Sequence, residues 1–71
     1  MNTIDRVTEL VNERGLTLFK LAMLCNVPYS TLKNTEKRRG QLAVDTIEQI
    51  CHGLGITMAE FFTEGGNKNG S

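Results

Sequence analysis

TLFKLAMLCNVPYSTLKNTE, residues 17–36, is the stretch that decides the fold of this 71-residue chain. Its first half carries apolar side chains at the i, i+3, i+4, i+7 spacing that places them on one face of a helix. These residues are Leu18, Leu21, Ala22 and Cys25. Asn26 follows, and asparagine tolerates the left-handed conformation in which a helix ends. The pattern predicts a helix that begins after Thr17, a good N-cap, and ends in a turn at Asn26.

A second short helix is predicted from Pro28 to about Lys37, because the fixed φ of proline suits the first turn of a helix. It offers a core only Leu32, Thr35 and Val27. The residues that it leaves outward are Tyr29, Ser30, Lys33, Asn34 and Lys37. A helix so short and polar gains little from burial, so we interpret it as one that presents side chains to a groove.

Three further helices are predicted around these two. The first spans residues 3–14 and ends at Gly15, with Ile4, Val7, Leu10 and Val11 on one face. After a loop over residues 38–43, the second spans residues 44–54 and ends at Gly55. Its apolar positions are Val44, Ile47, Ile50, Cys51 and Leu54. Thr57 and Glu60 form a capping box, which starts a short last helix.

The whole pattern predicts an all-α fold, a compact bundle of five helices with no useful β pattern. It forms one domain over residues 1–64, followed by a tail, residues 65–71, whose glycine-rich composition is typical of a flexible end. A domain of this size buries only about 60% of its unfolded surface. It therefore has room for one shared core and little room for an enclosed catalytic cleft.

Charge is balanced overall but unevenly distributed. Residues 33–39 contain four basic side chains and one acidic side chain, for a net charge of +3, and the rest of the chain carries −3. A basic run is usually a solvated surface, but beside a helix-turn-helix it can attract a polyanion even when the net charge is zero.

Several functional classes are not indicated. No signal peptide and no membrane-spanning stretch is visible, so we expect a cytoplasmic protein without a membrane partner. Cys25 and Cys51 fall in helical patterns and are interpreted as small buried apolar residues. His52 beside Cys51 does not suggest a metal site, because neighbours on a helix do not face each other. No acidic pair has catalytic spacing with His or Ser, so we expect no enzyme, no cofactor and no small-molecule ligand.

The residues also carry a family resemblance over about residues 4–62. The matching features are Gly15-Leu16-Thr17, Leu21-Ala22, Asn26-Val27, Ser30-Thr31-Leu32, Glu36, Thr46-Ile47, Ile50, Leu54-Gly55-Ile56-Thr57 and Glu60-Phe61-Phe62. With them the chain resembles the phage-repressor/Cro-like helix-turn-helix family, also called the XRE family. The resemblance implies a lambda-repressor-like bundle and a sequence-specific, double-stranded DNA-binding transcriptional regulator, a repressor, that acts as a homodimer on two half-sites about 34 Å apart.

The resemblance also implies which residues touch DNA. Base contacts fall on Tyr29, Ser30, Lys33 and Asn34. Phosphate contacts fall on Thr17, Thr31, Lys37, Arg38 and Arg39. The dimer contact is expected on the last helix, at Met58, Phe61 and Phe62, although these side chains also suit a core.

The chain departs from the family pattern at three points, and the departures at Leu18 and Thr35 leave a second interpretation open. Leu18 stands where the family often has Gln, and would pack on DNA sugars or on the ring of Tyr29 instead. Thr35 takes a core position and needs a hydrogen-bond acceptor, for which the carbonyl of Thr31 is nearest. Leu42-Ala43 replaces Pro-Ser and removes an N-cap. The alternative function is a protein-interaction module, such as an antitoxin or adaptor helix-turn-helix domain.

Overall fold

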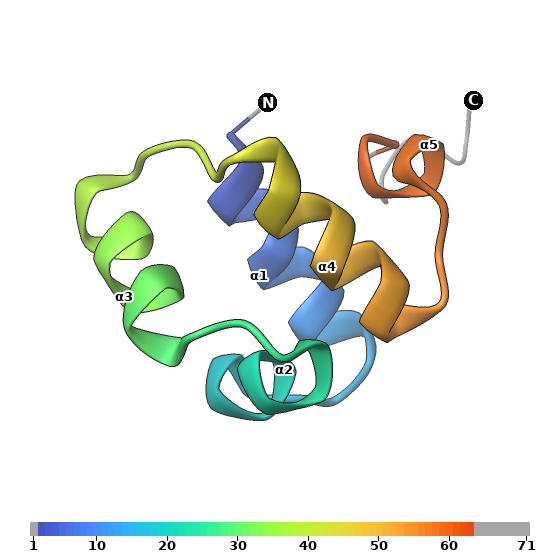
Figure 1. Ribbon diagram of the computed structural model, residues 1–71, viewed down its shortest axis with the longest axis horizontal. Helices are drawn as coiled ribbons and strands as arrows, with labels where there is room; N and C mark the ends of the chain where they lie inside the picture. The colour runs from blue at the N-terminus through green and yellow to red at the C-terminus, as the bar shows by residue number, and fades with distance from the viewer. Residues whose placement is uncertain (1, 64–71) are drawn as a thin grey trace.

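The computed structural model describes residues 2–63, and these form five helices and no strand (Figure 1). The helices are α1 (Thr3–Glu13), α2 (Leu18–Cys25), α3 (Tyr29–Arg38), α4 (Val44–Leu54) and α5 (Met58–Phe61). The predicted all-α bundle is confirmed. The predicted tail, residues 65–71, and the domain boundary at residue 64 lie outside the described residues.

Local chemistry sets most of the helix ends where it was predicted. The Thr17 hydroxyl accepts a hydrogen bond from the backbone N–H of Lys20, and Thr57 and Glu60 form the capping box. Asn26 ends α2 with a φ of 59°. Ala43 precedes α4 without a side-chain cap, as expected from the missing serine.

Helix α3 begins one residue later than predicted. Pro28 has a ψ of 129° and is the N-cap residue, so the first helical residue is Tyr29. The helix also continues to Arg38, and Arg39 then takes a left-handed conformation with a φ of 52°. Glycine adopts this conformation readily and arginine rarely does, which is why the residue types alone did not indicate this end.

The core draws on all five helices and on the loops between them. Its largest fully buried side chains are Phe61, Leu21, Leu32, Ile50 and Val7. Along the longest dimension of the molecule, α3 and α5 lie at opposite ends, with the other helices between them (Figure 1). Helix α3 contributes only Leu32 and Thr35 to the buried set, so most of its surface faces solvent.

One apolar position of the α4 pattern does not enter the core. Val44 is the first residue of α4, and its side chain is 62% exposed. Leu42, from the preceding loop, is buried instead, and its backbone N–H donates to the Thr3 hydroxyl at 2.7 Å. The loop therefore contributes Leu42 to the core, and the first buried residue of α4 is Ile47.

Helices α2 and α4 approach so closely at Gly53 that only glycine fits there. A Cβ atom built on Gly53 would lie 2.5 Å from the Cys25 Sγ and 2.8 Å from the Cys25 Cα. Carbon and sulfur atoms do not approach to such distances without displacement. This close approach fixes α4 against the C-terminal turn of α2.

Arg6 is buried on α1 and holds α5 in place. Its guanidinium donates to the carbonyl of Glu60 at 2.9 Å and also to the carbonyl of Phe61. It also forms an ion pair with the partly exposed Glu9 at 2.7 Å. These bonds attach the short last helix to the first one, and they keep the charge of Arg6 away from the surface.

Candidate nucleic-acid interface

The predicted base-contacting residues lie mostly on the face of α3 that points away from the core. With 100° of rotation per residue, the side opposite Leu32 and Thr35 carries Ser30, Lys33, Asn34 and Lys37. We call these four residues the outward row. Ser30, Asn34 and Lys37 are exposed and Lys33 is partly exposed. The row combines hydroxyl, amide and ammonium groups, which can donate or accept hydrogen bonds at the edges of bases.

Tyr29 lies beside this row and leans on α2. Its ring meets the ring of Phe19 edge to face, with the centroids 5.3 Å apart and the planes at 81°. Leu18 packs against the core cluster and is partly buried. The aromatic partner of Tyr29 is therefore Phe19, a residue that the sequence pattern did not single out.

Lys33 has an acidic neighbour one turn along α3. Its ammonium donates to the Glu36 carboxylate at 2.9 Å. This hydrogen bond, together with the charge of Glu36, raises the pKa of Lys33. Lys33 therefore stays positively charged at neutral pH, while Glu36 partly offsets its charge in the free protein.

The predicted phosphate-contacting cations gather at the C-terminal end of α3. Lys37, Arg38 and Arg39 are all exposed, and the side chain of Arg39 is 76% exposed. The guanidinium of Arg39 lies 3.7 Å from the carboxylate of Asp5, a distance at which an exposed pair contributes little. This end of α3 presents positive charge to solvent.

The loop behind these cations is attached to the start of α1. The Asn2 side-chain amide donates to the Arg39 carbonyl at 2.7 Å, and the Thr3 backbone N–H donates to the Gln41 side chain at 2.9 Å. Together with the Leu42 bond described above, these contacts hold the backbone at Arg39. They span 37 residues or more of the sequence, so no local pattern could reveal them.

The two predicted phosphate-contacting threonines differ in their surroundings. Thr17 is exposed at the start of α2, where its hydroxyl oxygen accepts the capping bond. Thr31 is partly buried, and its carbonyl accepts a 2.9 Å hydrogen bond from the Thr35 hydroxyl. This is the acceptor predicted for Thr35, so its burial costs little.

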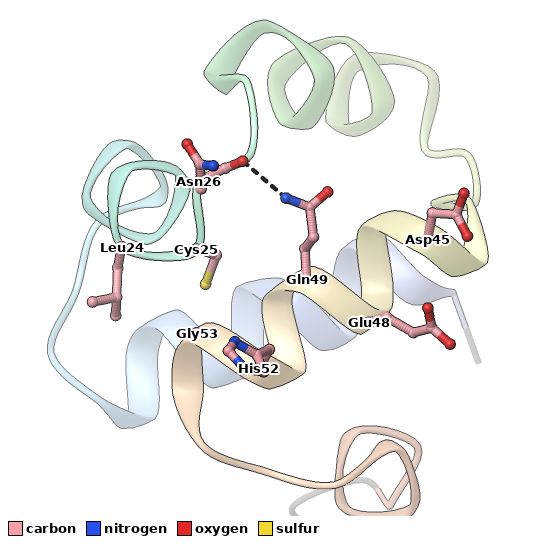
Figure 2. Close-up of a pocket in the computed structure, with 8 residues that line it drawn as sticks. All are labelled: Leu24, Cys25, Asn26, Asp45, Glu48, Gln49, His52 and Gly53. Atoms are coloured by element: carbon pink, nitrogen blue, oxygen red, sulfur yellow. Dashed lines mark hydrogen bonds between the residues drawn. The ribbon is translucent and has the colours of Figure 1, made fainter.

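A groove of about 600 Å³ lies along the junction of the end of α2 with α4 (Figure 2). Across it, the Gln49 side-chain amide donates to the Asn26 carbonyl at 3.0 Å. This bond braces the left-handed residue of the turn, and so it helps to fix α3 relative to α2. Asp45 and Glu48 give the α4 side of the groove a negative charge, opposite to that of the end of α3.

The two cysteines are buried free thiols, as their helical positions predicted. Burial raises the pKa of Cys25, and the proximity of Cys51 raises it further; burial is also the largest cause of the raised pKa of Cys51. Both thiols therefore stay protonated at neutral pH and pack as apolar groups. Within residues 2–63, no three His, Cys, Asp or Glu side chains are grouped as a metal ion requires.

The residues predicted for a dimer contact divide between core and surface. Phe61 is fully buried, so it takes the core role that its position also suited, and its side chain is not exposed to a second copy. Met58 is partly buried. Phe62 is 48% exposed, and its ring packs edge to face on Phe61 with the centroids 5.0 Å apart. The exposed apolar surface near α5 is thus centred on Phe62, the residue that follows this helix.

Comparisons with known proteins add to this description. A family model described as a Cro/C1-type helix-turn-helix DNA-binding domain matches residues 6–63, and families of this kind are typically non-enzymatic. Neither the curated proteins nor the solved structures include a match to this chain. None of the helices among the described residues is both long and apolar enough to cross a membrane.

Proposed function

The chain belongs to the family of Cro/C1-type helix-turn-helix DNA-binding domains, and from this premise we propose that it is a sequence-specific regulator of transcription. In this proposal α3 lies in the major groove of double-stranded DNA. The observation that carries it is the outward row of α3, four polar or basic side chains on the face opposite Leu32 and Thr35. A helix with that face free of core contacts is able to approach bases closely.

Each of these side chains matches the hydrogen-bonding groups of particular bases. The amide of Asn34 matches the N6 and N7 atoms of adenine, and the ammonium of Lys33 matches the O6 and N7 atoms of guanine. Ser30 both donates and accepts, so it discriminates less. Lys33 exchanges its hydrogen bond with Glu36 for a base acceptor when DNA binds.

The residues proposed to contact the DNA phosphates lie next to those proposed to contact the bases. Lys37, Arg38 and Arg39 supply positive charge for phosphates, and Thr17 and Thr31 supply hydroxyl groups. The hydrogen bonds from residues 2 and 3 to the loop after α3 hold the backbone at Arg39 before DNA binds. This reduces the conformational entropy that binding would otherwise cost.

In this proposal the bound domain represses transcription by blocking access to its DNA site. A homodimer would bind that DNA more tightly than a single domain. The exposed ring of Phe62, the residue that follows α5, supports a contact between two copies. Two domains joined there would bind half-sites about 34 Å apart.

Selection from a pool of random DNA duplexes, repeated at two salt concentrations, tests this proposal. An enriched motif is expected, and its affinity should fall with salt at a slope of about −3 per domain for three cationic phosphate contacts. Binding to a protein partner through apolar contacts would show little salt dependence. Failure to enrich a motif at either salt concentration would refute sequence-specific recognition.

Replacing Asn34 by alanine is expected to weaken binding to the selected site by about 1–3 kcal/mol and to relax the preference for one base. Binding to random DNA should change little, because the amide contacts no phosphate in this proposal. Competition assays with the selected and the random duplex measure both effects. An equal loss on the two duplexes would show that Asn34 does not read a base.

Replacing Arg38 by glutamate is expected to weaken binding to all duplexes alike and to reduce the salt slope by about 1. The thermal midpoint should change little, because Arg38 is exposed. The conservative variant Arg38→Lys keeps the charge, so it should retain affinity on both selected and random DNA. A large drop in stability for Arg38→Glu would instead assign the residue a structural role.

A further inference from the structure

An apolar surface adjoins the start of α3, next to the outward row. Phe19 is 53% exposed, Met23 is 65% exposed and Tyr29 is 39% exposed. With Pro28 they line a groove of about 380 Å³ between α2 and α3. Among the described residues, no charged side chain lines this groove. Such a surface is poorly matched to phosphate, which prefers cations and hydrogen-bond donors.

We infer that the Phe19–Tyr29 pair recognises thymine through its 5-methyl group, an inference that rests on the proposed function. In the major groove, the methyl group of thymine is the apolar feature that distinguishes this base from the others. Tyr29 is the first residue of α3, and the N-terminal residues of a recognition helix are those that contact base edges. The apolar groove therefore continues the reading surface at the point where bases are contacted.

Phe19 acts in this pair as a positioning residue. A half-exposed tyrosine on its own would sample several rotamers, but the edge-to-face contact at 5.3 Å favours the one that keeps its ring beside Phe19. The two rings then form one rigid apolar wall. A methyl group that packs against this wall leaves water without disturbing any ion pair of the protein.

Removal of the methyl group alone provides the test. In the duplex selected by the protein, each thymine is replaced in turn by deoxyuridine, which keeps every hydrogen-bonding group and lacks only the methyl. We expect one thymine in each half-site to show a three- to fivefold loss of affinity, about the effect of removing one buried methyl group. Equal affinity for all substituted duplexes, or a selected site without a required thymine, would overturn the inference.

Variants then assign the methyl contact to the pair. Tyr29→Phe should keep the deoxyuridine penalty because the ring remains, whereas Tyr29→Ala and Phe19→Ala should abolish or reduce it. Leu24→Ala is the matched control, because Leu24 is 55% exposed on the same helix as Phe19 but lines the other groove; it should keep the full penalty. Circular dichroism melts confirm that each variant is folded.

The outcomes separate this inference from the proposed function. Selection of a motif without any methyl dependence would overturn the inference and leave the function standing. A penalty that persists in both Tyr29→Ala and Phe19→Ala would assign the methyl contact to other residues. No motif at all would refute the proposed function itself.

Discussion

Replacing Gly53 by alanine is expected to lower the free energy of unfolding by about 3 kcal/mol or more, at or above the upper end of ordinary overpacking. The new Cβ would lie 2.8 Å from the backbone Cα of Cys25, and a backbone atom cannot rotate away as a side chain can. Relief requires α2 and α4 to separate. For a small domain of marginal stability, such a loss leaves a large unfolded fraction. Urea unfolding followed by circular dichroism measures it.

Two variants control this experiment. At Gly40 an added Cβ would meet only the Arg38 side chain, at 3.6 Å or more, so Gly40→Ala should be neutral or slightly stabilising. Removing the sulfur in the double variant Cys25→Ala, Gly53→Ala should recover only part of the loss, because the clash with the Cys25 backbone remains. Full recovery would show that the clash with the sulfur alone is responsible. Equal stability of Gly53→Ala and the wild type would refute the close approach of the two helices.

Replacing Arg6 by methionine is expected to cost about 2–4 kcal/mol, although methionine is apolar and favours helices. The change leaves the Phe61 carbonyl without the donor that Arg6 supplies, and an unsatisfied buried polar group is costly. Helix α5 has only four residues and depends on such outside contacts. In the Arg6→Met variant, hydrogen exchange should therefore be faster at the backbone amides of α5 than at those of the other helices.

The ion pair of Arg6 is expected to matter less than its carbonyl bonds. Glu9 is 45% exposed, so Glu9→Gln should cost under about 1 kcal/mol. Equal losses for Glu9→Gln and Arg6→Met would show that the ion pair, and not the attachment of α5, provides the stability.

The elements of this fold could be predicted because each leaves a local signal. The apolar faces of α1 and α2 follow the helical period, and Asn26 and Gly55 stop their helices by conformations that few other residues adopt. Capping residues such as Thr17 act within one turn of their own position. These effects depend only on neighbours in the sequence, so the sequence alone predicts where these helices begin and end.

The contacts between helices were harder to predict because their partners are distant in sequence. Arg6 meets the carbonyls of residues 60 and 61, and Gly53 meets Cys25. Weak signals existed: Arg6 lies on the apolar stripe of α1, and a glycine inside a helix often marks a close approach. Neither signal names the partner. A count of charges along the sequence cannot show that the charge of Arg6 is buried.

In the candidate site, too, local features could be predicted from the sequence and contacts between helices could not. The outward residues of α3 follow from the helical period once Leu32 is placed in the core. The pairing of Tyr29 with Phe19, however, depends on how α3 crosses α2. The left-handed Arg39 ends α3 with backbone bonds to the carbonyls of Thr35 and Glu36, and the bond that its own carbonyl accepts from Asn2 depends on how α1 packs beside the loop. Helical period identifies which side chains face out, and only the packed structure shows what stands beside them.

The sparse burial of α3 has an evolutionary consequence. Leu32 and Thr35 attach the helix to the bundle, whereas the outward row takes no part in the core. Mutations in that row are therefore expected to cost little in folding, whereas changes at Gly53 or Arg6 are expected to be costly. Under the proposed function, related copies of such a gene would diverge in the DNA sites that they recognise and still share one scaffold. The same separation makes the row a surface that can be redesigned without disturbing the core.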